Sequence, residues 1–304
     1  VKARRGMPTQ AYPAVRVAHC IVGGARGLPR REVYGSLRTI ADTLADNSTG
    51  ADIFLNLQLT ESDDSSKSSG TRTNRFTIDD LGRALRTLQP VAIDFSDRHG
   101  LAAYHRTPGC TNGNLSGPVC MQGTEYSCKF WAQVTRWHAC YEMVQEYEKK
   151  HNIRYDWIVR IRPDISLEST TMLRTVQAWM LQHHQPPVLR SEIMSVGAEG
   201  KGTLKDNFAL VPRELADEYF GAFRAMDLCE SLDTYERSCY NRPQSGEMLP
   251  TECILTHWIR HVRRVPELPR DARGNGSEAH FRMVRGDGSY RLLGGFSHLF
   301  RTYW

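Results

Sequence analysis

The sequence predicts a single α/β domain in which a mostly parallel sheet is flanked by helices. Short apolar runs rich in β-branched residues alternate along the chain with segments of helical periodicity, and this order is typical of parallel sheets with crossover helices. The 304 residues are 40% hydrophobic and 24% charged, which suits a globular protein with a large core. In such sheets ligands bind beyond the carboxyl ends of the strands. We therefore expect the chemistry of this chain just after its strands.

The first elements follow a basic, proline-bearing stretch. Residues 1–13 are aperiodic and suit a flexible stem, so the domain is expected over 14–304. Residues 15–22 predict a buried strand, because the run is apolar and ends at two glycines. Residues 30–45 predict a helix, because apolar side chains recur at helical spacing after a proline.

The same patterns continue along the rest of the chain. A polar, low-complexity stretch at 61–75 is expected to be a mobile surface loop, and the Gly/Pro/Cys-rich segment 96–122 receives no assignment. Apolar runs predict further strands, and amphipathic spacing predicts further helices. The strands are expected at 51–59, 90–95, 155–161 and 208–211, and the helices at 77–88, 125–150, 169–182, 213–226 and 250–264.

The cysteines and glycosylation sequons indicate the compartment. The chain has eight cysteines, and the absence of any CxxC pair disfavours a zinc ribbon or a thioredoxin-type site. Eight cysteines allow 105 pairings, so the connectivity stays open. Asn-x-Ser/Thr sequons occur at Asn47, Asn114 and Asn275. Together these features favour an oxidising secretory lumen. Because the sequence starts at Val1 and not at Met, we expect a luminal domain from which a signal or an anchor has been removed.

The charge balance limits the partners. The net charge is +5, from 39 basic and 34 acidic residues, which is too small an excess to suggest nucleic acid as a partner but compatible with a small anionic ligand. The sequence contains no GxSxG, HExxH, kinase or P-loop motif. These absences disfavour a serine hydrolase, a zincin, a kinase and a P-loop sulfotransferase.

The first candidate site follows the first strand. Gly23 and Gly24 let the backbone approach a ligand closely, and Arg26 offers a planar guanidinium to phosphate oxygens. A plain strand-to-helix turn explains the same residues equally well.

The second candidate site ends the strand at 155–161. Arg160, Arg162 and Asp164 share strand parity and are expected to point the same way. Asp164, placed after Pro163, would bind a divalent cation held by a diphosphate. The alternative is a structural ion pair between an arginine and Asp164. We favour the functional interpretation because the position is a strand's carboxyl end.

Three further polar positions complete the candidates. Asp206 and Asn207 lie at the mouth of a short strand, where an Asx turn is the alternative. Glu252 stands near a helix start and could act as a general base, although complementing the helix dipole is the simpler role. His298 lies in a Gly-rich tail and could reach a metal or a diphosphate; a lone histidine is more often structural.

Several of these motifs together resemble a known family. VGGAR at 22–26, WHACYE at 137–142, YDWIVR at 155–160 and the Arg-x-Asp of 162–164 are similar to motifs of largely uncharacterised plant and algal secretory-pathway proteins. That family is regarded as GT-A-like glycosyltransferases that use nucleotide-sugar donors. The resemblance covers residues 15–220 in scattered blocks.

The resemblance implies a fold, a cofactor and site residues. It implies a GT-A-like domain in the Golgi lumen, as the ectodomain of a type II membrane protein, with a UDP-sugar as donor and manganese as the expected divalent metal. Gly23, Gly24 and Arg26 would lie near the nucleotide, and Asp164 near the metal or the sugar. Arginine stands at 162, where GT-A enzymes usually carry the first aspartate of their acidic motif. An arginine there could neutralise part of the diphosphate charge directly.

Our leading hypothesis is therefore a luminal glycosyltransferase that moves a sugar to a hydroxyl of a glycan or glycoprotein. Arg26, Arg160 and Arg162 would counter the diphosphate charge, or support the site without touching the donor. Asn207 would add a polar contact to the donor, and Asp206 or Glu252 would orient or deprotonate the acceptor hydroxyl. The alternative is a non-catalytic carbohydrate-binding or scaffold protein on a degenerate transferase fold.

Overall fold

The structure is a computed structural model that describes most of the expected elements. It describes residues 15–45, 50–63, 72–75, 78–95, 125–167, 170, 173–174, 177, 180, 194–195, 207–228, 255–263, 281–284 and 290–293.

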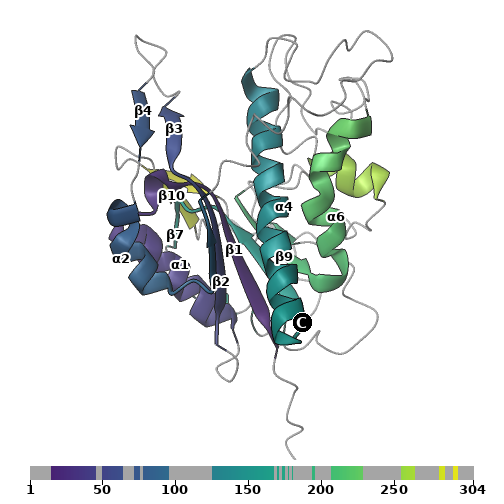
Figure 1. The fold of residues 1–304 in the computed structure, drawn as a ribbon, viewed down its shortest axis with the longest axis horizontal. Helices are drawn as coiled ribbons and strands as arrows, with labels where there is room; N and C mark the ends of the chain where they lie inside the picture. The colour runs from purple at the N-terminus through teal and green to yellow at the C-terminus, as the bar shows by residue number, and fades with distance from the viewer. Residues whose placement is uncertain are drawn as a thin grey trace, which may run out of the picture.

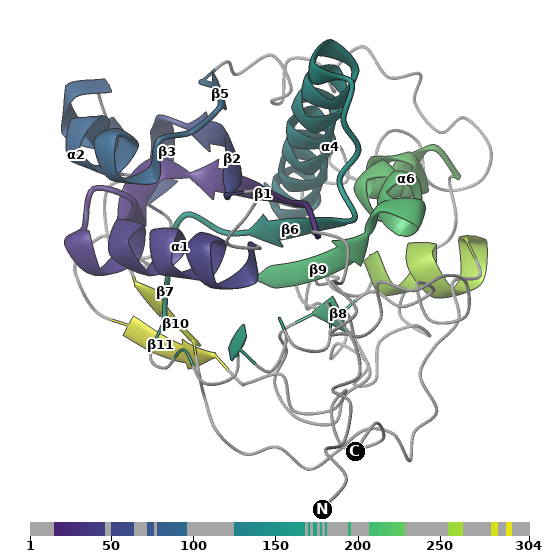
Figure 2. The same ribbon diagram turned by 90° about the horizontal axis from the view of Figure 1, so that it is seen from below.

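A six-stranded sheet forms the centre of the molecule (Figure 2). Its order is β5-β2-β1-β6-β9-β8, in which β5, β2, β1 and β6 run parallel while β9 runs antiparallel to both of its neighbours. The predicted mostly parallel α/β sheet is thereby confirmed. In chain order the strands are β1 (Val17–Gly24), β2 (Asp52–Gln58), β5 (Ala92–Asp94), β6 (Trp157–Ile161), β8 (Met194–Ser195) and β9 (Phe208–Pro212).

The strand order places a topological switch point between β1 and β6. After β1 the chain adds β2 and then β5 on one side, and β6 is later added on the other side. Neighbouring crossovers therefore leave β1 in opposite directions, and in open α/β sheets such a switch point is where ligands usually bind.

Helices cover both faces of the sheet (Figure 1). One face carries α1 (Arg31–Leu44) and α2 (Ile78–Leu88), and the other carries α4 (Glu125–His151) and α6 (Ala216–Phe220). Helix α1 buries side chains at helical spacing, because positions three or four apart share one face of a helix. They are Val33, Leu37, Ile40, Ala41 and Leu44.

Alternation along β1 divides the core into two halves. Val17 and Ile21 pack in the cluster beneath α1 and α2, whereas Ala18, Cys20 and Val22 pack in the cluster beneath α4. Both faces of this central strand are buried, which is why it reads as a nearly continuous apolar run.

The predicted helices are confirmed wherever the structure describes them. Residues 213–226 are helical but broken into η4 (Arg213–Leu215), α6 and η5 (Gly221–Leu228). Gly221 stands at the junction of α6 and η5, where its low helix propensity suits a change of helix type. Within 250–264 the described residues 255–263 are helical, with the wider turn η6 at Trp258–Val262.

The mobile loop expected at 61–75 is wrong at both of its ends. Strands β3 (Thr60–Asp63) and β4 (Arg72–Arg75) pair antiparallel, and the register sets Asp63 opposite Arg72. The polar composition concealed these strands because neither has the apolar alternation that predicts one. Residues 64–71 lie outside the described residues.

A second small sheet was also not predicted. Strands β7 (Ile165–Leu167), β10 (Phe281–Val284) and β11 (Tyr290–Leu293) form an antiparallel sheet of order β11-β10-β7. It joins the chain just after β6 to the C-terminal part of the sequence. Strands of three and four residues are too short for a periodic signal, and this pairing is made across more than 100 residues.

A disulfide ties the two layers on the α4 side together. Cys20 of β1 bonds Cys140 of α4, and both side chains are fully buried. This pair agrees with the interpretation of the cysteines as staples; the other six cysteine side chains lie outside the described part. Among the described helices, none is both long and apolar enough to cross a membrane.

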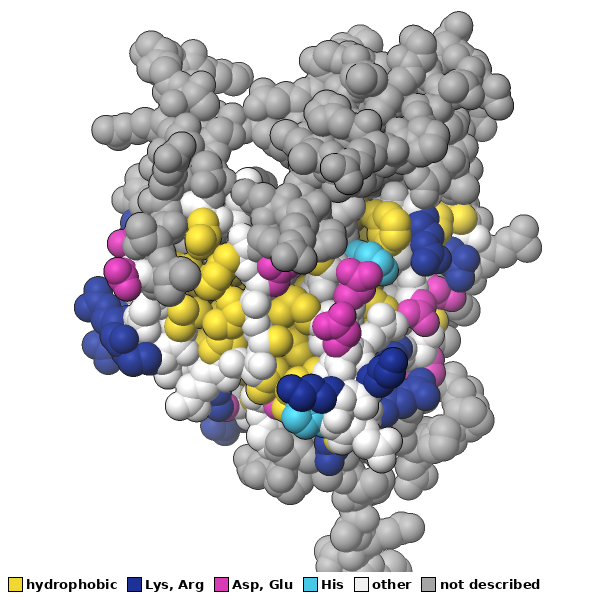
Figure 3. Space-filling model, viewed as in Figure 1, with side chains coloured by type: hydrophobic (Ala, Val, Ile, Leu, Met, Phe, Trp, Pro, Cys, Tyr) yellow, Lys and Arg dark blue, Asp and Glu magenta, His cyan; other side chains and the backbone are white. Residues whose placement is uncertain are grey.

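The free edge of the central sheet is apolar. Val91 and Ile93, at edge strand β5, are the large hydrophobic residues most exposed in the described part of the chain, at 38% and 41%. Hydrophobic side chains gather over this edge of the molecule, between α2 and α4 (Figure 3).

Candidate functional site

The switch point between β1 and β6 brings two of the predicted motifs together. At the end of β1, Gly23 has a φ of +142°, which L side chains rarely adopt. A Cβ at this glycine would lie 3.0 Å from Cδ of Pro163, in the turn that follows β6. Gly23 is thus required both by the backbone conformation and by the close approach of the next strand's end. Gly24 ends β1 opposite Gln58 of β2.

A third glycine, Gly27, makes this contact closer still. It ends the single turn η1 (Ala25–Gly27), and a Cβ there would lie 2.7 Å from Cα and 2.8 Å from Cβ of Asp164. Real Cβ atoms essentially never approach a backbone atom so closely. The sequence analysis missed Gly27, because the need for glycine arises from a segment about 140 residues away in the chain.

Arg162 and Asp164 form a bidentate ion pair in this turn. Nε of Arg162 donates to Oδ1 of Asp164 at 2.9 Å, and Nη2 donates to Oδ2 at 2.8 Å. The Asp164 side chain is 2% exposed and the Arg162 side chain 19% exposed. A carboxylate this deeply buried needs a charged partner, and Arg162 supplies one. An ion pair between an arginine and Asp164 was the structural alternative to a ligand site at these residues, and the structure contains this pair.

Strand parity accounts for only part of this motif. Strand β6 ends at Ile161, and Pro163 and Asp164 form a turn before β7. The expectation that Arg160, Arg162 and Asp164 point the same way along one strand therefore fails at Asp164. Instead, the turn lets the carboxylate fold back onto the guanidinium two residues earlier.

Arg160 lies inside the core, on the α4 side of the sheet. Its side chain is fully buried, with Cζ 4.3 Å from the centre of the Trp137 ring. Its Nε and Nη2 donate to the hydroxyl of Tyr219 at 3.2 and 3.0 Å. The rings of Trp137 and Tyr219 are themselves stacked, 5.6 Å apart. Of its two predicted roles, this placement favours support of the site over contact with a donor.

A polar pair on the neighbouring strands extends the same edge. Asn56 near the end of β2 lies opposite Asp94 at the end of β5, and its Nδ2 donates to Oδ2 of Asp94 at 3.0 Å. Asn56 is fully buried, and its Oδ1 has no hydrogen-bond partner in the described structure. The sequence analysis missed this pair, although an asparagine inside the apolar run DIFLNLQ is an unusual feature that could have indicated it.

Asn207 joins the site from the antiparallel strand. Because β9 runs opposite to β6, its first residues lie at the carboxyl edge of β6. The main-chain carbonyl of Asn207 accepts a hydrogen bond from the Arg162 amide at 3.2 Å, and its buried Oδ1 has no partner among the described residues. Buried polar atoms without partners are rare in proteins and are often completed by a ligand or water.

The remaining predicted residues lie beyond what the structure describes. Asp206, Glu252 and His298 fall outside the described residues, as does the side chain of Arg26. The structure therefore brings together Gly23, Gly24, Arg162, Asp164 and Asn207 at one edge, and adds Gly27, Asn56 and Asp94.

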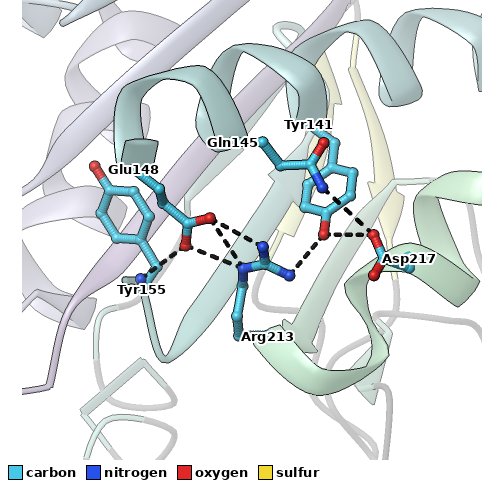
Figure 4. A network of polar contacts seen from close by, with 6 residues as sticks. All are labelled: Tyr141, Gln145, Glu148, Tyr155, Arg213 and Asp217. Carbon is cyan, nitrogen blue, oxygen red and sulfur yellow. Dashed lines mark hydrogen bonds and ion pairs between the residues drawn. The ribbon is translucent and has the colours of Figure 1, made fainter. Parts of the chain in front are cut away.

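A separate polar network lies at the opposite edge of the sheet (Figure 4). Arg213, which follows β9, pairs with Glu148 of α4 at 2.9 Å, and its Nη1 donates to the Tyr141 hydroxyl at 2.6 Å. That hydroxyl donates to Asp217 of α6 at 2.7 Å. Burial and the bond to Asp217 raise the pKa of Tyr141 well above its ordinary value. A tyrosine held protonated in this way serves as a structural donor joining α4 to α6, remote from the switch point.

The predicted metal site is incomplete in the described part of the chain. Among the described residues no group of three or more His, Cys, Asp and Glu side chains could hold a metal ion. Asp164 is the one predicted ligand that the structure describes, and both of its oxygens already accept bonds from Arg162. These residues do not by themselves fit a cation, so no chemical step is assigned to one here.

Comparison with known proteins adds no family assignment. No protein-family model matches the chain, and no curated protein matches it significantly.

Proposed function

We propose that this chain is a glycosyltransferase with a GT-A-like fold, which transfers a sugar from a nucleotide donor to a glycan or glycoprotein hydroxyl in the Golgi lumen. The observation that carries the proposal is the switch point between β1 and β6. Here β1 ends in two glycines, and the partly exposed Arg162 follows the end of the neighbouring β6. Switch points of this kind bind nucleotides in open α/β sheets. Two of the motifs that resemble the glycosyltransferase family, at 22–26 and 155–160, lie on β1 and β6 and at their ends.

The residues at this edge suggest a division of roles. The backbone at Gly23 and Gly24 would lie close to the donor's diphosphate, beside the Pro163 ring that packs against Gly23. The bidentate pair with Asp164 fixes the orientation of the Arg162 guanidinium, which would lie beside the donor's diphosphate. Asp94, held by the Nδ2 of the buried Asn56, would offer its carboxylate to the nucleotide. Asp206 and Glu252 stay the proposed candidates for orienting the acceptor hydroxyl.

The role of a metal stays a separate proposal. The family resemblance implies manganese with Asp164 as a ligand, and His298 is a further candidate ligand from the sequence; this site would require the Asp164 carboxylate to exchange Arg162 for the cation. A direct role of Arg162 in neutralising the diphosphate needs no such exchange. A titration of transfer activity with manganese and with a chelator separates the two, and Asp164→Ala serves as the variant control.

The test of the proposed function is a donor screen. We expect the wild-type chain to hydrolyse one nucleotide sugar from a panel of UDP-, GDP- and CMP-sugars. Arg162→Ala should raise the KM for that donor at least tenfold, because the diphosphate loses a charge-assisted partner. Arg83→Ala, which removes an exposed arginine of α2, is the matched control and should leave the KM unchanged. Hydrolysis of no donor, or equal KM values in both variants, would count against the proposal.

One observation favours the second candidate, a non-catalytic carbohydrate-binding or scaffold protein. The Arg162–Asp164 pair satisfies its own charges, as a structural ion pair does, and leaves the switch point without a dedicated acidic motif. Thermal shift with nucleoside diphosphates, with and without manganese, distinguishes the two candidates. Ligand binding to the folded state stabilises a transferase, whereas a scaffold protein would show no shift with any nucleotide.

A further inference from the structure

An open groove runs along the outer face of α1 beside β7. It has a volume of about 730 Å³, and α1 contributes most of its wall, with Leu167 of β7 facing it. Figure 2 shows α1 alongside β7, on the side of the sheet away from α4. None of its lining residues was singled out by the sequence or is used by the proposed donor site.

One end of the groove lies at the first residues of α1, the helix that follows β1 and η1. Arg31, the first residue of α1, follows the end of β1 by seven positions, and Leu167 follows Asp164 by three. From Arg31 to Thr39 the groove then extends along the helix for about 12 Å, at 1.5 Å per residue. One end therefore lies near the switch point, and the other lies two turns further along the helix.

A glycine in the wall has no structural explanation. Gly35 lies inside α1, where glycine costs about 1 kcal/mol relative to alanine. A Cβ built there would meet nothing within 4 Å, and its φ lies outside the left-handed range that would require glycine. What the missing side chain does provide is open space and exposed backbone in the groove.

The polar groups of the wall suit a polyhydroxyl ligand. The Ser36 hydroxyl donates to the Glu32 carbonyl at 2.5 Å, and the Thr39 hydroxyl donates to the Gly35 carbonyl at 2.9 Å. Each hydroxyl donates its hydrogen to a carbonyl of the helix, so its oxygen lone pairs can accept hydrogen bonds from sugar hydroxyls.

The charged and apolar groups complete this complementarity. Arg31 and Glu32, both exposed at the groove, add a donor and an acceptor. Leu167 and the Gly35 backbone offer apolar surface to the C–H face of a sugar ring. The mixture of donors, acceptors and apolar surface matches a saccharide better than a lipid or a nucleic acid.

We infer that this groove binds the saccharide acceptor, with its reactive end toward the switch point and further sugar units along α1. The inference rests on the proposed function, because it assigns the acceptor side of that transfer. Saccharide binding itself, however, does not depend on a donor and can be measured alone.

The test fills the groove at Gly35. The variant is Gly35→Phe, and the matched control is Gly82→Phe, a mid-helix glycine of α2 whose added Cβ would meet only the tip of Arg86 at 3.5 Å. Binding is measured on an array of defined N-glycan, O-glycan and neutral hexose and pentose oligosaccharides. We expect wild-type and Gly82→Phe chains to bind the same oligosaccharides, and Gly35→Phe to lose at least tenfold in affinity with an unchanged nucleotide-induced thermal shift.

The remaining outcomes separate the two proposals. Equal binding by both glycine variants, or binding of no oligosaccharide by the wild type, would overturn the groove assignment. Groove-dependent saccharide binding without any donor hydrolysis would support the groove and count against the transferase. If Gly35→Phe does not fold, the double variant Ser36→Ala and Thr39→Ala removes the two acceptors without adding volume and should weaken binding in the same direction.

Discussion

Gly27 and Gly35 differ in the space around them: a Cβ at Gly27 would clash with Asp164, whereas a Cβ at Gly35 would meet no atom within 4 Å. Alanine substitutions should therefore change stability in opposite directions. Gly27→Ala would place a Cβ 2.7 Å from Cα of Asp164, so the turn after β6 must shift. We expect a loss of roughly 1–3 kcal/mol in the free energy of unfolding, as for overpacked core positions. Gly35→Ala meets no atom, and we expect a gain of about 0.4–1 kcal/mol because the unfolded chain loses freedom.

Urea unfolding of the two alanine variants and the wild type provides the measurement. The two substitutions are chemically identical, so their difference isolates the contact with Asp164. Equal stability changes would show that β1 and β6 do not approach each other as the structure has them.

His19 should make stability depend on pH in the acidic range. It lies fully buried in β1, and its Nε2 has no hydrogen-bond partner among the described residues. Burial, followed by the charge of Arg38, lowers its pKa from 6.5 to about 3. Between pH 6.5 and about 3, His19 is therefore protonated in the unfolded state but neutral in the folded state. Stability is complete above pH 6.5 and falls by about 1.4 kcal/mol per unit as the pH decreases toward 3.

The variant His19→Leu removes this proton from the unfolded state. Carboxylates also titrate in this range, so the informative quantity is the difference in slope between the variant and the wild type, from urea unfolding at pH 7.5, 6 and 5. We expect the variant to have the shallower slope. Parallel slopes would mean that His19 is protonated in the folded state.

At the scale of elements, the network in Figure 4 holds α4 to the segment after β9. Glu148 and Arg213 are 9% and 14% exposed, so removing one partner leaves a largely buried charge. We expect Arg213→Leu to cost roughly 3–5 kcal/mol. Tyr141→Phe removes only hydroxyl contacts and should cost about 1–2 kcal/mol.

A double-mutant cycle distinguishes a network from independent contacts. Glu148→Gln added to Arg213→Leu should restore part of the stability, because the unpaired carboxylate is gone while an acceptor for the Tyr155 amide is kept. Additive losses in thermal or urea unfolding would contradict the coupling between the two residues.

The elements that the sequence predicted are those with strong local signals. The helix at α1 follows from apolar side chains at helical spacing, and β1 follows from a β-branched run that ends in glycine. Strands β3 and β4 were missed because their sequences are polar, and β7 because it pairs with β10 more than 100 residues away; β10 and β11 pair locally but are too short for a periodic signal. Length and periodicity carry no information about such partners.

In the candidate site, too, only the residues with a local sequence signal could be predicted. Gly23, Gly24, Arg162 and Asp164 could be selected because each follows a predicted strand. The role of Gly27 and the pairing of Asn56 with Asp94 depend on which strands become neighbours. Strand parity made Arg160 a candidate site residue, but parity does not show whether a side chain faces a ligand site or the core. In the structure the Arg160 side chain lies over the Trp137 ring and donates to the Tyr219 hydroxyl.

At the scale of the whole molecule, the Cys20–Cys140 disulfide links the central strand to the longest described helix across 120 residues of sequence. Closing so long a loop restricts the unfolded chain strongly, and loss of a native disulfide costs roughly 2–5 kcal/mol. Either single substitution breaks the bond. We therefore expect Cys20→Ala, Cys140→Ala and the double variant to lose similar amounts of stability.

Non-additivity is the decisive feature of this experiment, and it bears on the proposed compartment. Two independent buried thiols would instead each lose a small, additive amount on substitution, as for any small core side chain. Unfolding of the wild type should also shift to lower denaturant after treatment with a reductant under unfolding conditions. In the double variant, which lacks the Cys20–Cys140 bond, reduction of this bond cannot contribute to a shift of the unfolding midpoint. A wild-type chain that folds equally well with and without reductant would contradict both the structural role of the disulfide and the oxidising lumen that the cysteines predict.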